Sequence, residues 1–206
     1  MEPFTKLTAI AVPLDQANID TDQIIPARFL GKLRPAQING YFHDFRLDPN
    51  GRPREGVTLN NPAYKDAKII VANYNFACGS SRENAVTVMV DNGFRAFIAP
   101  SFGDIFFGNC FQNGVLPIRL PVEQVRVLAT LAADGALFTV DLLQNVVLAA
   151  DGSRWPFEVE PLRRVSLLEG LDDIGLTLKH AGAIDEWESA DLAARPWTWP
   201  MKTAGL

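Results

Sequence analysis

Cysteine, histidine and surplus positive charge are all scarce in this chain of 206 residues. Its two cysteines, Cys78 and Cys110, are too few and too far apart for a disulfide framework or a close-spaced metal site, and we expect both thiols to be reduced. The two histidines, His43 and His180, lie in contexts that do not suggest a hydrolase base. The net charge is −5 and no run of Lys or Arg offsets it, so nucleic acid is not an expected partner.

Long apolar segments are missing as well. No apolar run approaches the roughly 18 residues that would suggest a membrane span, and the N-terminus lacks the basic and then apolar pattern of a signal peptide. We therefore expect a cytoplasmic protein without membrane association. The composition, 48% hydrophobic and 21% charged, and the length both fit a single domain that covers residues 1–206.

Strand and helix patterns alternate through the middle of the chain and indicate an α/β fold with a parallel sheet built from βαβ units. The predicted strands are residues 6–12, 68–72, 94–99 and 115–120, and the predicted helices are residues 82–92, a segment from 100 towards 109 and a segment that begins at Pro121. Residues 31–66 are rich in Pro, Gly and Asn and predict a long loop region.

The pattern changes after residue 136. Short apolar segments separated by turn residues predict antiparallel strands near 138–142, 146–148 and 155–159, followed by helices near 160–169 and 181–194. The aromatic tail, about residues 189–206, is expected to face a partner, because a short terminus is usually loose unless it is tied down.

The clearest candidate site is the turn at residues 78–83, Cys-Gly-Ser-Ser-Arg-Glu, between a predicted strand and a predicted helix. A helix start leaves backbone N–H groups free and carries a positive dipole end. Gly79 permits close approach of a ligand, and the hydroxyls of Ser80 and Ser81 and the guanidinium of Arg82 add polar groups. Together they predict a carboxylate or phosphate site.

Simpler interpretations of these residues stay open. Ser80 and Glu83 have the spacing of a capping box, which would only close the helix, although a capping box does not need Arg82. Asp20 and Asp22 lack the Gly and closing Glu of a calcium loop and fit a polar turn. The cations Arg28, Lys32 and Arg34 fit an ordinary charged surface, and Asp104 fits a favourable residue at a helix start.

Four motifs in this order resemble the small subunits of isopropylmalate dehydratases, in the aconitase superfamily. They are residues 18–26 (NIDTDQIIP), 78–83 (CGSSRE), 98–107 (IAPSFGDIFF) and 170–178 (GLDDIGLTL). The resemblance covers the chain from about residue 4 to about residue 188. It implies an aconitase-type swivelling domain, a β/β/α three-layer α/β fold with a partly parallel sheet.

The resemblance also implies a role for named residues and for a partner. Ser80 would be the catalytic base, Ser81, Arg82 and Arg34 would contact a substrate carboxylate, and Asp22 would belong to the active site. A large subunit would carry a [4Fe–4S] cluster, in a heterodimer or heterotetramer, and this chain itself would bind no metal or cofactor. The activity implied is a hydro-lyase of leucine biosynthesis that isomerises 2-isopropylmalate to 3-isopropylmalate and works only with that large subunit.

Four positions depart from the family pattern. Asn84 replaces the usual His, Ala77 replaces the usual Gly before the Cys, and Pro35 and Ala36 follow Arg34 where Thr and Gly are usual. These changes leave open a sister hydroxy diacid as substrate, of the methylmalate, dimethylmalate or homoaconitate type. A non-catalytic anion-binding module is an alternative of another class. A serine hydrolase that uses Ser80 is disfavoured, because no His stands in a suggestive context and no G-x-S-x-G turn is present.

Overall fold

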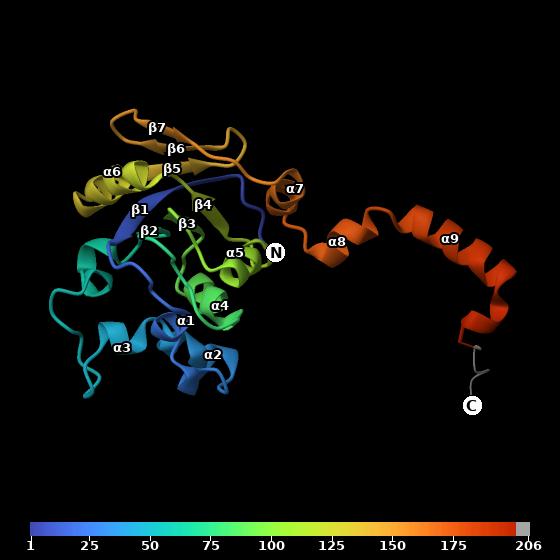
Figure 1. The fold of residues 1–206 in the computed structure, drawn as a ribbon, viewed down its shortest axis with the longest axis horizontal. Coiled ribbons are helices and arrows are strands. Elements are labelled where there is room, and N and C mark those ends of the chain that lie inside the picture. The colour runs from blue at the N-terminus through green and yellow to red at the C-terminus, as the bar shows by residue number, and fades with distance from the viewer. Residues whose placement is uncertain (201–206) are drawn as a thin grey trace. The chain divides into compact units, whose positions relative to one another are not determined.

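The computed structural model describes residues 1–200. The chain divides into two compact units, Met1–Gly170 and Leu171–Leu206, and each is described by itself (Figure 1). The first unit contains the whole sheet and its helices. The prediction that residues 1–206 form one domain stays a prediction.

Seven strands form one sheet in the order β4-β3-β2-β1-β5-β6-β7. The first four run parallel to one another, and the last three extend the sheet beyond β1 as an antiparallel ribbon. The strands are β1 (Lys6–Leu14), β2 (Ile69–Ala72), β3 (Ala96–Ala99), β4 (Leu116–Arg119), β5 (Leu137–Asp141), β6 (Val146–Ala149) and β7 (Arg154–Pro156).

Strand β1 joins the two halves of this sheet. Its first half, from Lys6 to Ile10, pairs antiparallel with β5, whereas its second half, from Ala11 to Leu14, pairs parallel with β2. The predicted α/β class with a partly parallel sheet is therefore confirmed, and β1 is the strand where the pairing changes direction.

Seven helices of the first unit connect or cover the strands. They are α1 (Thr21–Ile24), α2 (Arg34–Gln37), α3 (His43–Arg46), α4 (Asn84–Asp91), α5 (Asp104–Gln112), α6 (Val122–Ala133) and α7 (Pro161–Glu169). Helix α6 shows why the sequence folds this way: Pro121 precedes its first turn, and Val125, Leu128 and Ala132 recur at helical spacing on its buried face.

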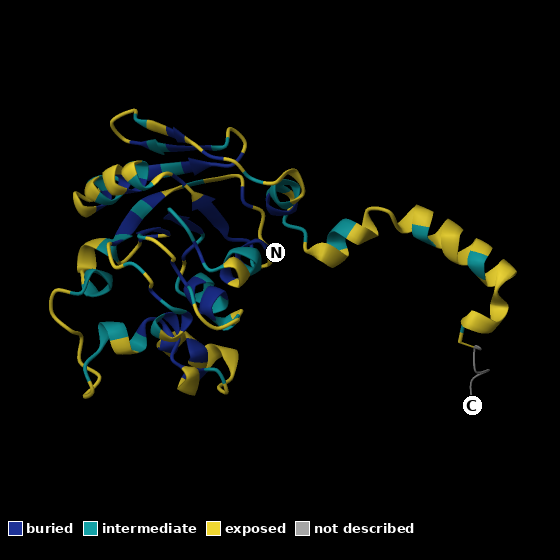
Figure 2. Cartoon of the chain, in the orientation of Figure 1, coloured by how far each residue is buried: buried dark blue, intermediate teal, exposed yellow. Residues whose placement is uncertain are grey.

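Two apolar cores lie on opposite faces of the sheet, because successive side chains of a strand point to opposite sides. In β3, Phe97 enters one core, and Ala96 and Ile98 enter the other. Residues of α1, α4 and α5 belong to the first core, and residues of α6 and of the antiparallel ribbon belong to the second. Figure 2 shows the strands largely buried beneath helices that are exposed on their outer sides.

The differences from the predicted elements are local. The helix predicted from residue 82 begins at Asn84, and the helix predicted from residue 100 begins at Asp104. Residues 31–66 are not a bare loop region, since they contain α2, α3 and several 3₁₀ turns. Elements of three or four residues are too short to show a helical period, so the pattern could not reveal them.

The second unit contains α8 (Asp173–Leu178) and α9 (Ala181–Ala194). Asp172 caps α8 by accepting a hydrogen bond from the Gly175 N–H over 2.7 Å. No residue from 171 to 200 is buried, and Trp199 donates from its indole N–H to Asp191 over 2.9 Å. The partner-facing tail stays a prediction, and residues 201–206 lie outside the described part. Across residues 1–200, no helix has the length and apolarity needed to cross a bilayer.

Candidate active site

The turn predicted as the site lies after β2, at the carboxyl edge of the parallel strands. That edge is where open α/β sheets commonly place their ligands. Two isolated parallel bridges hold neighbouring loops against the turn: Phe76 pairs with Phe102, and Cys78 pairs with Asp20. Loops that follow β1, β2 and β3 therefore converge at one place.

Backbone hydrogen bonds fix the turn from two sides. The Phe76 N–H donates to the Ser101 carbonyl over 3.0 Å. On the other side, the Thr21 N–H donates to the Cys78 carbonyl over 2.9 Å, and the Thr21 hydroxyl donates to the Ser80 carbonyl over 3.2 Å. Thr21 is buried, so these bonds are shielded from water and hold the position of the serine backbone.

Gly103 makes a close contact beneath this turn. A Cβ atom at Gly103 would lie 2.4 Å from the Ala77 carbonyl oxygen and 3.1 Å from the Cys78 Cα atom. The backbone of Gly103, at φ −60° and ψ 133°, is open to any residue. Space, and not backbone conformation, therefore requires a glycine at this position.

We expect Gly103→Ala to lower the free energy of unfolding by about 1–3 kcal/mol, because the added methyl group must push the backbone at Ala77 aside. Chemical denaturation of the purified chain measures this change. Gly108→Ala is the control: Gly108 lies within α5, the helix that Gly103 precedes, and has no atom within 4 Å of its Cβ position, so the change should be neutral or stabilising by up to about 1 kcal/mol. Equal effects of the two substitutions would contradict the steric argument.

Ala77 itself has a left-handed backbone, with φ 57°, as do Asn75 and Gly79 in the same turn. A residue with a Cβ atom pays about 1–2 kcal/mol for this conformation, and glycine does not. The Gly that the resemblance leads one to expect at this position would fit that geometry. Burial of the Ala77 methyl group, which is 2% exposed, offsets part of the strain.

Asp22 and Arg82 meet across the converging loops. Asp20 caps α1 through a capping box with Gln23, with hydrogen bonds of 2.7 and 2.9 Å, and so orients the first turn that carries Asp22. The Arg82 guanidinium donates to the Asp22 carboxylate over 2.5 Å. The Arg82 side chain is only 18% exposed, whereas Asp22 is 52% exposed, so Asp22 holds a largely covered cation in place.

The capping-box interpretation of Ser80 and Glu83 is wrong. Helix α4 begins at Asn84, its N-cap residue is Glu83, and no side-chain hydrogen bond caps it. The Glu83 carboxylate instead accepts from the Asn113 amide over 3.0 Å. Ser80 therefore lies a full turn before the helix and does not close it.

Several polar groups of the turn are left available. Ser80 and Ser81 are both exposed, and their hydroxyls form no hydrogen bond with any group in residues 1–200. The backbone N–H groups of residues 80–84 likewise donate to nothing within that range. Two hydroxyls, a row of N–H donors and the Arg82 cation suit an anion that accepts several hydrogen bonds.

Arg34 makes no hydrogen bond to the serine turn within residues 1–200. Its guanidinium makes two hydrogen bonds to the Asp91 carboxylate, of 3.1 and 3.0 Å, and these bonds raise the pKa of Arg34 above its usual value. Asp91 ends α4, roughly 10 Å along the helix from Asn84 at 1.5 Å per residue. The Glu83 carboxylate, which adjoins Arg82 in the sequence, also contributes to the raised pKa of Arg34. The role of Arg34 as a substrate contact stays a prediction.

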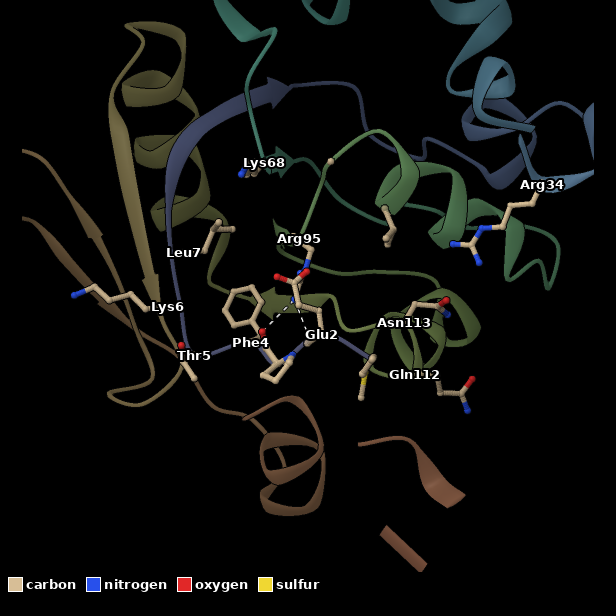
Figure 3. Close-up of a pocket in the computed structure, with 14 residues that line it drawn as sticks. Glu2, Phe4, Thr5, Lys6, Leu7, Arg34, Lys68, Arg95, Gln112 and Asn113 are labelled. Carbon is tan, nitrogen blue, oxygen red and sulfur yellow. Dashed lines mark hydrogen bonds and ion pairs between the residues drawn. The ribbon is translucent and has the colours of Figure 1, made fainter. Parts of the chain in front are cut away.

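Arg34 lines a hollow of about 800 Å³ at the amino ends of the strands, the opposite edge of the sheet (Figure 3). Arg95 dominates this hollow: it forms an ion pair with Glu2 and donates to the carbonyls of Glu2, Pro3 and Gly114. These bonds occupy the guanidinium. The hollow is therefore an anchor for the N-terminal segment, and Arg95 is not free for a ligand.

Other charged residues near the converging loops are also engaged. Arg28 pairs with Asp44, which in turn contacts His43, and the Arg28 hydrogen bond lowers the pKa of Asp44 to about 2. Asp104 lies in the first turn of α5, as predicted, and is almost fully exposed, with Arg119 at 3.8 Å. Neither pair contributes a free cation to the serine turn.

The cysteines do not provide ligands for a metal cluster. Cys110 is fully buried, and burial raises the pKa of its thiol well above the usual value. Cys78 stands alone in the serine turn, and residues 1–200 contain no group of three or more His, Cys, Asp or Glu side chains placed to bind a metal. These donors do not fit an iron–sulfur cluster, which takes several thiolates.

Comparisons with known proteins agree with this geometry. The family model "Aconitase C-terminal domain" matches residues 1–123, and the model for the C-terminal domain of the 3-isopropylmalate dehydratase small subunit matches residues 173–199. A 3-isopropylmalate dehydratase small subunit from Gluconacetobacter diazotrophicus is 52% identical over 201 residues, which is 96% of this chain and 97% of that protein. The chain belongs to the 3-isopropylmalate dehydratase small-subunit family.

Further members of the small-subunit family are similar over the same length. The relative from Rhodospirillum centenum is 49% identical over 96% of this chain and 98% of its own length. The crystal structure of 3-isopropylmalate dehydratase from Methanocaldococcus jannaschii superposes with a TM-score of 0.64 at 25% identity, over 89% of this chain and 99% of that one. The predicted resemblance and the swivelling α/β fold are thereby confirmed.

The sequence did not reveal the structural role of some residues that shape this small-subunit site. Thr21 acts through its hydrogen bonds to the turn, and Gly103 through the space it leaves; neither property shows in a local pattern. Gln37 and Asn84 join the segment before α3 to the start of α4 through a 2.9 Å hydrogen bond. Gln37 lies in a region predicted as loop, where a buried amide is not expected.

Proposed function

We propose that this chain is the small subunit of a 3-isopropylmalate dehydratase, a hydro-lyase that interconverts 2- and 3-isopropylmalate in leucine biosynthesis. It would act in the cytoplasm with a large subunit, as a heterodimer or heterotetramer. The names of relatives near 50% identity over almost their whole length support this assignment. The large subunit would hold a [4Fe–4S] cluster, which supplies a Lewis acid for the substrate hydroxyl and carboxylate.

One observation in the structure carries the proposal: Arg82 and Asp22, sixty positions apart, form an ion pair beside two unbonded serine hydroxyls. Arg82 and Ser81 would bind a substrate carboxylate, because a guanidinium can donate two parallel hydrogen bonds to it. Asp22 would hold Arg82 in the required orientation.

Ser80 would be the base of the reaction. It would remove the proton from the substrate carbon next to the one that loses its hydroxyl, and return a proton during rehydration. A free serine hydroxyl is a weak base, so the alkoxide needs stabilisation. The neighbouring Arg82 cation and the unbonded N–H groups of residues 80–84 would provide it once the site is closed to water.

The decisive experiment is to co-express the chain with a large subunit from the same organism and to restore the cluster under anaerobic conditions. The purified pair is then assayed with 2-isopropylmalate, and the small subunit alone is assayed in parallel. We expect turnover by the pair and none by the small subunit. Activity of the small subunit alone, or inactivity of a correctly assembled pair on every hydroxy diacid tested, would overturn the proposal.

A sister substrate is the second candidate, because Pro35 and Asn84 depart from the family pattern. The same assay with methylmalate, dimethylmalate and homoaconitate-type diacids decides this by comparing kcat/KM. A non-catalytic anion-binding module would bind carboxylates with no turnover in the presence of the large subunit. A serine hydrolase would instead react with a fluorophosphonate at Ser80.

Arg34 supplies a further prediction. If it binds substrate, it must first leave Asp91, and this exposed ion pair is weak enough to break, at about 0–1 kcal/mol. We expect Asp91→Asn to lower KM of the assembled enzyme about two- to fivefold by releasing Arg34. Steady-state kinetics measure this, with Asp134→Asn, at the end of α6, as the control. An unchanged KM would argue that Arg34 has only a structural role.

A further inference from the structure

The side chain of Gln37 is one of the few buried polar groups of the molecule, at 8% exposure. Its amide nitrogen donates to two carbonyls of its own segment, Leu30 at 3.2 Å and Lys32 at 2.8 Å. Its amide oxygen accepts from the Asn84 side chain at 2.9 Å. One carboxamide thus gathers residues 30–37 into a closed loop and fastens that loop to another element.

The point of attachment is next to the serine turn. Asn84 is the first residue of α4 and follows the turn with only Glu83 between it and Arg82. Ser81 and Arg82 have no regular secondary structure, so few local bonds hold them. A link at Asn84 therefore restrains the end of the turn that Thr21 does not reach.

The segment 30–37 and the next residue, Ile38, touch the far end of α4 by weaker contacts. Arg34 pairs with Asp91 in an exposed position, and the Asn92 side chain donates to the Ile38 carbonyl over a longer 3.3 Å. An exposed ion pair is screened by water, whereas breaking the Gln37 bond leaves a buried amide unsatisfied. The two ends of α4 thus differ in how firmly they hold the segment.

We propose that Gln37 and Asn84 form a positioning pair that sets the serine turn and the segment 30–37 in one fixed arrangement. This inference rests on the proposed function of the turn. Neither residue is placed on the substrate; they act through Ser80 to Arg82. The pair also gives the departure at Asn84 a physical role, because the side-chain amide donates the proton that the Gln37 oxygen accepts.

The experiment compares Asn84→Ala with Asn92→Ala, which removes the contact of the other end of α4 with Ile38, the residue after the segment, together with a 2.8 Å hydrogen bond to the Val88 carbonyl. In the assembled enzyme we expect Asn84→Ala to lower kcat by about ten- to a hundredfold, because a small misplacement of reacting groups has an effect of this size. The kcat of Asn92→Ala should stay within about twofold of the wild-type value. Asn84→His, which restores a side-chain N–H, should recover part of the loss. Equal kcat values of the two alanine variants would contradict the proposed positioning role of Gln37 and Asn84.

A double-mutant cycle shows whether the two residues act through one bond. Gln37→Met keeps the length of the side chain without its polar atoms. The double variant with Asn84→Ala should show no larger decrease in kcat than the more impaired single variant. Fully additive losses would overturn the inference. Should Asn84→Ala fail to fold, Gln37→Met tests the same link from the other side.

Hydrogen exchange on the full-length small subunit separates this inference from the proposed function. Asn84→Ala should increase exchange of the backbone amides of residues 85–87, which donate to the Arg82 and Glu83 carbonyls, and Asn92→Ala should not. Unchanged exchange in both variants would overturn the positioning pair even if the enzyme is active. If the wild-type pair of subunits has no activity, the proposed function fails. The hydrogen-exchange result still shows whether the Gln37–Asn84 bond restrains the serine turn.

Discussion

Ser80→Ala should lower kcat of the assembled dehydratase by about two to four orders of magnitude, the usual contribution of a general base. The hydroxyl is exposed and unbonded within residues 1–200, so its removal should change the free energy of unfolding by less than about 0.5 kcal/mol. The two effects are measured by steady-state kinetics of the pair and by denaturation of the small subunit.

Ser81→Ala is the matched control for Ser80→Ala, because both residues are exposed hydroxyls in the same turn. As a carboxylate contact, Ser81 should affect mainly KM. A collapse of kcat in both variants would leave the base unassigned between the two serines. Normal kcat in Ser80→Ala would leave the proton transfer without a residue in this chain.

Arg82→Lys should cost about 1.5–3 kcal/mol of transition-state stabilisation, although the charge is conserved. Lysine can keep an ion pair with Asp22, but it cannot donate two parallel hydrogen bonds to a carboxylate. We therefore expect kcat/KM to fall about ten- to a hundredfold, with the fold intact by circular dichroism.

Arg126→Lys, at an exposed position of α6, controls for a general effect of replacing arginine by lysine and should leave kcat/KM unchanged. Asp22→Asn tests whether Asp22 orients Arg82. It should lower kcat/KM less than Arg82→Lys does. Nearly normal kinetics in Arg82→Lys would show that Arg82 only packs against α1.

The regular elements of this protein can be predicted from its sequence because their signals are local. Strand β2 is a short apolar run, and α6 combines a starting Pro121 with apolar residues at helical spacing. The predicted start of α4 at residue 82 is two residues too early, and the chain does not use the capping-box spacing of Ser80 and Glu83.

The candidate site is only partly predictable for the same reason. The turn at residues 78–83 has a composition that indicates an anion site, and the structure pairs its Arg82 with Asp22, which the family resemblance had already suggested. The position of Arg34 beside Asp91 depends on how a long irregular segment folds over α4, which no periodic pattern encodes. Gln37 gives no sequence signal because its burial depends on the tertiary contacts of that segment.

The double pairing of β1 has a consequence for how the chain folds as it is made. Its second half can pair once β2 has been synthesised, but its first half must wait for β5: the side chains of Thr8 and Thr139, which hydrogen-bond, are 131 positions apart. Contacts of such long range slow folding, because the chain loses loop entropy before they form. We therefore expect the edge of β1 to stay open on the ribosome, where premature pairing with other nascent chains is the main hazard.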